Sequence, residues 1–394
     1  MNETALAHGM DGRLVEPDWA VLTLDEVHGL LNRFEGLGKA VRIASVSPRP
    51  FSAASVVETE NGRVFIKRHH CAVRDREGLL EEHRFMQHLL AHGAKVPRVL
   101  ATEAQETAIE IDEWTYEVHE VPEGVDLYRD ALSWTPFRSE AHARSAGRAL
   151  ARLHCAARGF DALRRKPRPL VASFTIFAAR DSAMEMDGYV DARPALAEDG
   201  LTLKCCEDAL ELVNPFHEKL LPLLPSLPSL WTHNDLHASN LLWSDSGGDA
   251  EGTAIIDFGL ADRTNAVHDL AHAIERSIVE WLALVEHPDR PHEVPVHVDH
   301  LQALLKGYEQ VRPLSDAEAQ ALAPMTALCH AEFALSETDY FLGVLHSQEK
   351  AAMARDGWLL GHARWFRSTA GKKLLNAIEV WADTRKLALP GERP

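Results

Sequence analysis

The chain has 394 residues, which is enough for two or three domains and for a large buried core. Its 41 Lys and Arg residues against 59 Asp and Glu residues give a net charge of −18, which disfavours nucleic acid and anionic lipid as main partners. With 46% hydrophobic and 25% charged residues, the composition is that of an ordinary globular protein and excludes a disordered or fibrous chain.

The cysteines and the apolar runs indicate the cellular compartment of the protein. Five cysteines without a CxxC pair, in a chain of this size, favour a reducing environment. No uncharged apolar run reaches the ~18 residues that a membrane span requires, and the first residues lack the basic and apolar stretches of a signal peptide. We therefore expect a cytoplasmic protein that contacts no membrane, and the sequence leaves its oligomeric state open.

The first 121 residues predict a small β-rich lobe. Residues 19–36 show helical spacing of apolar side chains, and Thr23 followed by Glu26 is a capping box at their start. Short segments rich in β-branched residues follow, with a hairpin turn at Asn61-Gly62. Six segments are strand candidates, namely 40–46, 55–59, 63–69, 96–100, 106–112 and 113–121, and a helix is predicted over 75–93. We expect a five-stranded antiparallel sheet that carries one helix.

Beyond Pro122 and Gly124 the pattern becomes helical. The predicted helices are 138–158, 203–223, 266–286, 297–311, 316–346 and 357–384. Residues 229–260 are the exception, because two short strands flank loops that are rich in polar side chains. Polar loops on a rigid scaffold commonly carry function, so we expect the chemistry there.

Two motifs in this segment are typical of phosphoryl transfer. Residues 233–240 read HNDLHASN and match HxDxxxxN, and a DFG motif begins at Asp257. An incoming hydroxyl group needs a carboxylate to orient it and accept its proton, which is the role expected for Asp235. His233, in the same motif, is a second candidate catalytic residue. Mg²⁺ prefers hard oxygen ligands, which Asn240 and Asp257 would supply.

Further segments extend the pattern across the chain, namely RVFIKRH around Lys67, LLEEHRFMQHLLAHGAKVPRVL at 79–100, ALARLH at 149–154 and VHDLA at 267–271. Together with the two motifs they resemble the aminoglycoside phosphotransferase and choline kinase superfamily, which also includes type II homoserine kinases and the bacterial stress-response kinases. The resemblance implies a two-lobed, protein-kinase-like α+β fold. A small antiparallel β-sheet lobe over 1–121 would bind the nucleotide, and a large helical lobe over 122–394 would carry the catalytic loop and the acceptor site.

The resemblance also implies roles for single residues. Lys67 would bind the α and β phosphates of ATP, and Glu82 would pair with Lys67. Asp269 would brace the catalytic loop from its helix. ATP and Mg²⁺ are the implied cofactors. No GxGxxG precedes Lys67, so the hydroxyl groups of Ser52 or Ser55 are candidates to cover the phosphates.

Adenine is expected against the segment that joins the lobes, residues 117–126, because a connection between domains offers backbone groups in a crevice. Glu120 and Val121 are the candidate contacts, since Pro122 lacks an N–H group that could donate to the base.

Acidic residues after the DFG motif are candidates for the acceptor pocket. They are Glu275, Glu280, Glu332, Glu337 and Asp339. We take Glu275, Glu332 and Asp339 as the candidate acceptor ligands, because the resemblance places their helices beside the acceptor. The alternative is that these carboxylates lie on solvated helix faces. The net charge of −18 favours a cationic or zwitterionic acceptor over an anionic one.

We therefore expect an ATP-dependent phosphotransferase that moves the γ-phosphate to a hydroxyl group of a small molecule, such as an amino alcohol, amino acid, amino sugar or aminoglycoside. A protein Ser/Thr kinase of the bacterial stress-response type and a nucleotide-binding pseudokinase are the alternatives. No APE triplet follows the DFG motif, which disfavours a protein substrate. The intact Lys67, Asp235, Asn240 and Asp257 disfavour a pseudokinase. The identity of the acceptor and the choice between ATP and GTP stay open.

Overall fold

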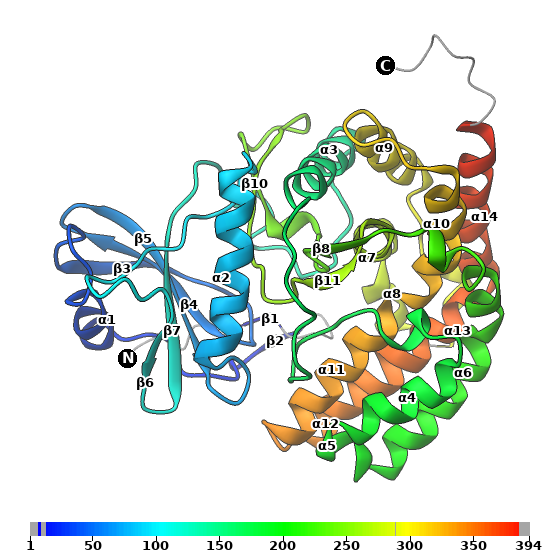
Figure 1. Cartoon of the computed structure of the whole chain (residues 1–394), viewed down its shortest axis with the longest axis horizontal. Coiled ribbons are helices and arrows are strands. Elements are labelled where there is room, and N and C mark those ends of the chain that lie inside the picture. The colour runs from blue at the N-terminus through cyan, green and yellow to red at the C-terminus, as the bar shows by residue number, and fades with distance from the viewer. Residues whose placement is uncertain (1–6, 9–12, 288, 386–394) are drawn as a thin grey trace.

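The computed structural model describes residues 7–8, 13–287 and 289–385, and Figure 1 shows two lobes of unequal size. The smaller lobe contains a five-stranded antiparallel sheet with the strand order β3-β4-β5-β7-β6. Its strands are β3 (Ala40–Val46), β4 (Ala53–Thr59), β5 (Gly62–His70), β6 (Ile109–Ile111) and β7 (Trp114–Glu120). Residues 96–100, predicted as a strand, contribute an isolated bridge between Val99 and His119 instead.

One face of this sheet forms an apolar core together with α1 (Leu24–Leu31). The Thr23 hydroxyl accepts a hydrogen bond from the Glu26 N–H, and the Thr23 N–H donates to the Glu26 carboxylate. The predicted capping box is therefore confirmed, although the helix is shorter than the predicted 19–36. A short antiparallel pair, β1 (Ala7–His8) and β2 (Leu14–Val15), precedes it.

The helix α2 (Arg76–Ala91) follows β5 in the chain but packs against the larger lobe. Phe85 and Met86 on its apolar face belong to the core of that lobe, which is separate from the core of the sheet. The Phe85 ring centroid lies 5.4 Å from that of Trp231 and 6.0 Å from that of Phe258. Figure 1 shows α2 between the sheet and the helical lobe. Packing thus joins α2 to the helical lobe.

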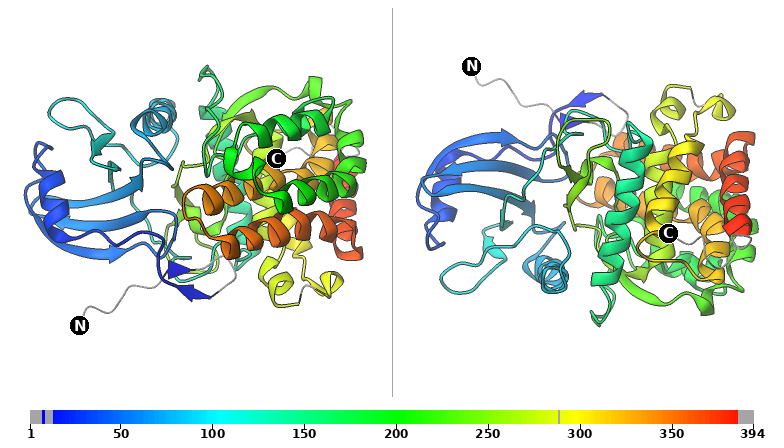
Figure 2. Two further views of the ribbon diagram at one scale, coloured as in Figure 1. Left: turned by 90° about the horizontal axis from the view of Figure 1, so that it is seen from below. Right: turned by 90° about the horizontal axis from the view of Figure 1, so that it is seen from above.

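The larger lobe is mostly helical (Figure 2). Its helices are α3 (Glu140–Ala156), α4 (Ser182–Asp191), α5 (Pro194–Ala197), α6 (Gly200–Leu220), α7 (Ala266–Ile278), α8 (Trp281–Glu286), α9 (Val298–Glu309), α10 (Asp316–Leu328), α11 (His330–Gly343), α12 (Gln348–Ala352), α13 (His362–Arg367) and α14 (Thr369–Thr384). Shorter turns are the 3₁₀ helices η1 (Ile176–Ala178), η2 (Leu224–Ser226), η3 (Ala238–Asn240) and η4 (Pro291–Glu293), and the π-helix η5 (Met353–Gly361).

Three of the long predicted helices are divided in the structure. The breaks lie after Ile278 in 266–286, at Cys329 in 316–346, and at Ser368 in 357–384. Ser368 adopts an extended ψ of 172°, and its hydroxyl caps the start of α14. Apolar periodicity continues across each break, so the sequence pattern predicts one helix where the backbone forms two or more. The helices α4, α5 and α12 lie outside every predicted helix.

Four short strands in the helical lobe hold the polar loops. They are β8 (Ser229–Thr232), β9 (Leu241–Trp243), β10 (Gly252–Ile255) and β11 (Asp262–Asn265). β8 pairs with β11 and β9 pairs with β10, both antiparallel, where the sequence predicted two strands. These pairings bring residues 233–240 and the DFG motif together. The predicted fold class, an α+β fold with a small antiparallel sheet lobe and a large helical lobe, is confirmed. No helix in the described part of the chain is long and apolar enough to cross a membrane.

Candidate active site

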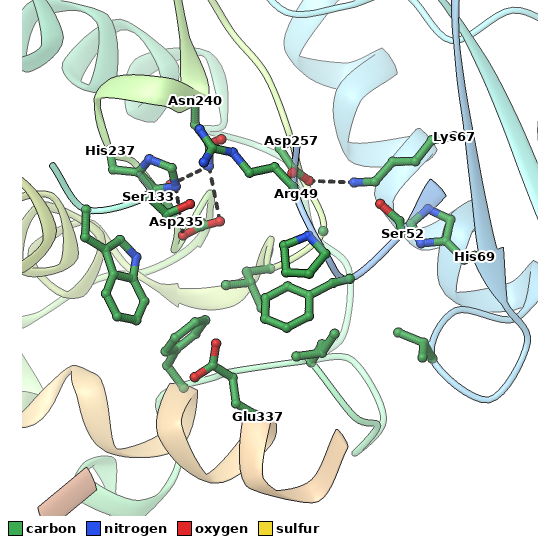
Figure 3. A pocket seen from close by; sticks show the side chains of 18 of the residues that line it. Arg49, Ser52, Lys67, His69, Ser133, Asp235, His237, Asn240, Asp257 and Glu337 are labelled. Carbon is green, nitrogen blue, oxygen red and sulfur yellow. Dashed lines mark hydrogen bonds and ion pairs between the residues drawn. The ribbon is translucent and has the colours of Figure 1, made fainter. Parts of the chain in front are cut away.

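Two pockets in the cleft between the lobes share five lining side chains, which are Arg49, Ser52, Lys67, Asn240 and Asp257. The sheet-side pocket extends from these residues to the connection between the lobes, where Glu120 and Val121 line it. The helix-side pocket extends toward α11 and is lined by Asp235, Phe333 and Glu337 (Figure 3). Molecules bound in the two pockets would therefore meet at the five shared side chains.

An ion pair crosses the junction of the two pockets. The Lys67 Nζ on β5 lies 2.9 Å from Oδ1 of Asp257. A dashed line joins the two side chains in Figure 3. Burial alone would lower the pKa of Lys67, but the Asp257 carboxylate raises it above its ordinary value. Burial would raise the pKa of Asp257, but the Lys67 ammonium group holds it below its ordinary value. Both groups therefore stay charged near neutral pH.

Asp235 lies in the loop between β8 and η3, and two side chains fix its carboxylate. The Asn240 amide donates to Asp235 Oδ2 at 3.1 Å, and the guanidinium of Arg276, on α7, pairs with Oδ1. Arg276 is buried and lies 4.2 Å from the Phe333 ring centroid, and burial lowers its pKa to about 10. Arg276 was not among the residues predicted for the site. Its place two helical turns after Asp269 is the signal that relates it to the catalytic loop.

Asp269 holds the backbone of the loop. Its Oδ2 accepts a hydrogen bond from the His233 N–H and its Oδ1 from the Asn234 N–H, both at 2.8 Å. The His154 ring bonds Oδ2 at 2.9 Å, and Asn234 has a positive φ of 60°. The bracing contact that the family resemblance implies for Asp269 is therefore present.

The side chain of His233, at the start of the catalytic loop, lines neither pocket. Its Nδ1 accepts a hydrogen bond from the Asp235 N–H at 3.2 Å, so its Nε2 carries the proton and donates to the Ile256 carbonyl at 2.9 Å. Burial lowers the pKa of His233, which keeps the ring neutral. Because backbone groups occupy both ring nitrogens, the catalytic role predicted for His233 is wrong, and the residue positions the loop instead.

Glu82 pairs with two arginines and not with Lys67, so the predicted Lys67–Glu82 pair is wrong. Glu82 Oε1 lies 2.7 Å from Arg74 Nε and 2.8 Å from Arg165 Nη2. Arg165 comes from the segment after α3, and nothing in the sequence pattern indicates that it reaches α2. Both arginines also donate to the Gly259 carbonyl, at 2.6 and 3.0 Å, and so connect α2 to the DFG motif.

The two serines proposed for the phosphates differ in position. Ser52 lines both pockets, whereas Ser55 lines neither and its buried hydroxyl has no hydrogen-bond partner among the described residues. Side chains alternate along β4, so Ala54 and Val56 face the sheet-side pocket and Ser55 points to the other face. The role predicted for Ser55 is therefore wrong, and that of Ser52 stays a prediction.

Glu120 and Val121, the candidate adenine contacts, both line the sheet-side pocket. The Glu120 N–H already donates to the Arg98 carbonyl at 2.9 Å. Since Pro122 has no N–H group, the N–H of Val121 is the remaining candidate donor in this stretch.

The three carboxylates predicted to bind the acceptor line neither pocket, and all three are buried and not solvated. Glu275 lies 2.8 Å from Nδ1 of His362. Glu332 accepts hydrogen bonds from backbone N–H groups at the start of η1. Asp339 lies 3.8 Å from Nε of Arg193. Both the predicted acceptor role and the solvated alternative are therefore wrong for these residues.

Glu337 is the acidic residue of α11 that reaches the helix-side pocket. It lies one turn after Phe333, which lines the same pocket. Its side chain is fully buried, and neither carboxylate oxygen has a hydrogen-bond partner in the part of the chain that the structure describes. Burial raises the pKa of Glu337 well above its ordinary value, against the opposing effect of Arg276. The pocket thus contains a buried carboxyl group whose two oxygens are free to accept hydrogen bonds from a bound molecule.

Arg49 and His237 complete the site and were not indicated by the sequence. Arg49 places a guanidinium group at the junction of the pockets. His237 lines the helix-side pocket, with Nε2 3.8 Å from Oδ1 of Asp235. Burial and the positive charge of Arg49 lower the pKa of His237 to about 3, so its ring is neutral near neutral pH.

The polar atoms at the junction fit a hard divalent cation. Asn240 uses its Nδ2 to donate to the carbonyl and the carboxylate of Asp235, which leaves its amide oxygen for a cation. Lys67 bonds Oδ1 of Asp257, which leaves Oδ2. Two such oxygen donors beside a cleft are the ligands that Mg²⁺ prefers.

The chain matches the model of one protein family, described as the phosphotransferase enzyme family, over residues 49–314. A homoserine kinase of Agrobacterium fabrum is 26% identical over 245 residues, which cover 60% of this chain and 61% of that protein. A homoserine kinase of Xanthobacter autotrophicus is 27% identical over 317 residues, which cover 80% of this chain and 83% of that protein. The chain spans about three fifths of the length of the first two homoserine kinases that it matches.

Solved structures share the fold. A microcompartment-associated aminopropanol kinase superposes with a TM-score of 0.56 at 17% identity, covering 90% of this chain and 98% of its own. The amicoumacin kinase hAmiN, in complex with AMP-PNP, Ca²⁺ and Ami, superposes with a TM-score of 0.53 at 15% identity, covering 86% and 94%. At these identities the likeness concerns the fold.

Proposed function

Because the chain belongs to the phosphotransferase enzyme family, a family of small-molecule kinases, we propose that it transfers the γ-phosphate of ATP to a hydroxyl group of a small amine. One observation supports this most directly. The two pockets meet at Lys67 and Asp257, and Asp235 lines only the helix-side pocket. A nucleotide in the sheet-side pocket would present its phosphate to an acceptor beside Asp235.

In this proposal the sheet-side pocket holds ATP, with adenine at Val121 and the phosphates at the junction. Lys67 binds phosphate oxygens, and Arg49 adds a second positive charge at the same place. Mg²⁺ held by Asn240 and Asp257 would neutralise charge on the phosphates.

Asp235 is the proposed general base. Asn240 and Arg276 hold one carboxylate oxygen each, so the group is oriented before the acceptor arrives. The acceptor hydroxyl donates its proton to Asp235 as its oxygen attacks the γ-phosphorus. A new bond forms between the acceptor oxygen and the γ-phosphorus. The bond from the γ-phosphorus to the bridging oxygen breaks, and ADP leaves with the bridging oxygen.

The helix-side pocket suits an acceptor that carries an ammonium group. Glu337 offers a buried carboxylate without a partner among the described residues, and the rings of Trp134 and Phe333 line the same pocket. An ammonium group would donate the hydrogen bonds that the Glu337 oxygens lack and would gain from contact with the aromatic faces. An amino alcohol or a hydroxylated amino acid has this amine together with a hydroxyl group that can reach Asp235.

The test measures the release of ADP from ATP, in the presence of Mg²⁺, with a panel of acceptors. Homoserine is compared with 4-hydroxybutyrate, and 1-amino-2-propanol with 1,2-propanediol, so that each amine has a partner without the amino group. We expect turnover with at least one amine and loss of turnover without the amino group. Asp235→Asn should lower kcat by roughly 10²- to 10⁴-fold while ATP affinity changes little.

Two results would contradict the proposal. One is ADP release that no small hydroxylated amine increases above the rate with water alone. The other is transfer of labelled phosphate from ATP into protein instead of into the small molecules, which would favour the protein kinase alternative.

A further inference from the structure

A buried group of two histidines and a glutamate lies between α2 and β7, apart from the residues assigned to phosphate transfer. His83 comes from α2, whereas Glu117 and His119 lie two residues apart on β7 and so share one face of the strand. Among the described residues, this is the group whose three ligand atoms lie within 4.8 Å of one another. The Nε2 atoms of His83 and His119 lie 2.9 and 2.8 Å from Glu117 Oε2.

We propose that His83, Glu117 and His119 form a zinc site. Two imidazoles and one carboxylate are a donor set that zinc takes in protein sites with three ligands and one open position. Imidazole nitrogen also disfavours Mg²⁺ and Ca²⁺, which select oxygen donors. Tetrahedral zinc holds its nitrogen and oxygen ligands roughly 3.3 Å apart. Each of the two Nε2 atoms would therefore separate from Glu117 Oε2 by only about 0.5 Å.

Neighbouring groups orient two of these ligands as partners do in metal sites. His83 Nδ1 lies 3.0 Å from the Thr107 hydroxyl, which can accept a proton from Nδ1 when Nε2 binds a metal. His69 Nε2 lies 3.1 Å from Glu117 Oε1 and can donate to it, which leaves Oε2 for the metal. Each hydrogen bond thus fixes the ligand atom that faces the centre of the group.

The group can be reached from the cleft. Glu117 and His119 line the sheet-side pocket, and His69 lines the helix-side pocket. His83 is almost fully buried behind them. A metal ion can therefore enter from the cleft, and the fourth coordination position would face it.

The site would connect two parts of the molecule that have separate cores. His83 lies on α2, whose apolar face packs with the helical lobe, whereas Glu117 and His119 belong to the sheet. A zinc ion that binds all three would add a bond between these parts in the native state alone. Zinc should therefore raise the melting temperature of the protein.

The experiment uses the full chain without a histidine tag, freed of metals with a chelator. Zinc is titrated in competition with a chromophoric chelator, and we expect one tightly bound equivalent. His119→Gln should weaken zinc affinity by at least roughly 100-fold, and Thr107→Val by about 10- to 100-fold. The matched control is His88→Gln, an α2 histidine that stacks on His92 outside the group, and it should bind zinc as the wild type does.

Two further measurements separate metal binding from folding. Thermal unfolding with one equivalent of zinc should show a higher melting temperature for the wild type and His88→Gln and no change for His119→Gln. Cobalt titrated into the wild-type protein should give the strong visible absorption of tetrahedral coordination, and this result needs no variant. Equal zinc affinity in His119→Gln and His88→Gln, or a wild-type cobalt spectrum of octahedral type, would overturn the proposal.

Discussion

The guanidinium of Arg276 pairs with the carboxylate of Asp235 from beneath the catalytic loop. The helix α7 that carries Arg276 also carries Asp269, which binds the backbone N–H groups of His233 and Asn234. One helix therefore positions both the backbone of the loop and the side chain of its proposed base.

Arg276→Met tests this positioning. The variant keeps an apolar side chain under Phe333 but removes the charge that holds Asp235, so the base loses its fixed orientation. We expect kcat to fall by roughly 10- to 100-fold while the KM for ATP changes little. Arg276→Lys should recover part of the rate in steady-state kinetics. An equal loss of ATP affinity would show that Arg276 serves the fold of the cleft and not Asp235.

Asp257→Ala should remove Mg²⁺-dependent nucleotide binding. The variant takes away a proposed metal ligand and also the partner that holds Lys67 at the junction. Titration calorimetry with ATP, with and without Mg²⁺, measures the effect. Unchanged affinity in the presence of Mg²⁺ would mean that the metal ligand is misassigned.

Glu337→Gln should weaken the binding of acceptors that carry an amine. Loss of a charge-assisted contact is expected to raise their KM by roughly 10- to 150-fold, with little change for acceptors without an amine. Asp339→Asn is the matched control, because Asp339 is a buried carboxylate of the same helix that lines neither pocket. If both variants behave alike, the amine is not bound by Glu337.

The same contact predicts a pH dependence. Burial raises the pKa of Glu337, so the carboxyl must lose a proton before it pairs with an ammonium group. The KM of the amine should therefore fall as pH rises through the raised pKa of Glu337 in the wild type and stay level in Glu337→Gln. Parallel profiles in the two proteins would argue against this linkage.

Glu275 should make stability depend on pH. Burial raises its pKa from 4.5 to about 7, against the opposing charges of His330 and His272. Between these two values the unfolded chain releases the proton and the native state retains it. Stability is therefore fully present below this window and decreases as pH rises through it.

Glu275→Gln keeps a polar side chain of the same size beside His362 but has no proton to release. We expect the free energy of unfolding of the wild type to drop by up to about 3 kcal/mol more than that of the variant from pH 5 to pH 8. Urea unfolding at several pH values measures both curves. Curves that run parallel would show that Glu275 is ionised throughout.

The fold class and the catalytic loop could be predicted because their signals are local. The residues of HNDLHASN lie within one loop, so their spacing in sequence determines their spacing in the site. Short segments rich in β-branched residues, and the turn at Asn61-Gly62, likewise predict the sheet. Partners that come from distant segments could not be predicted, and Arg165, which reaches Glu82 from the segment after α3, is an example.

The prediction of the acceptor ligands failed for a different physical reason. On a half-exposed helix, polar residues mark the solvent face and apolar residues mark the core. The helix α11 is buried on all sides, and Glu332, Glu337 and Asp339 are all buried in it. Its sequence therefore does not tell which carboxylate faces the pocket, and the packed structure is needed to identify Glu337.

The division of the apolar cores has a consequence for how the cleft is held. The sheet has an apolar core of its own, whereas α2 shares the core of the helices. Lys67 belongs to the sheet and Asp257 to the helical lobe, so the 2.9 Å contact between them joins the two parts across the cleft. A nucleotide that binds both residues would therefore hold the sheet and the helical lobe together at this point.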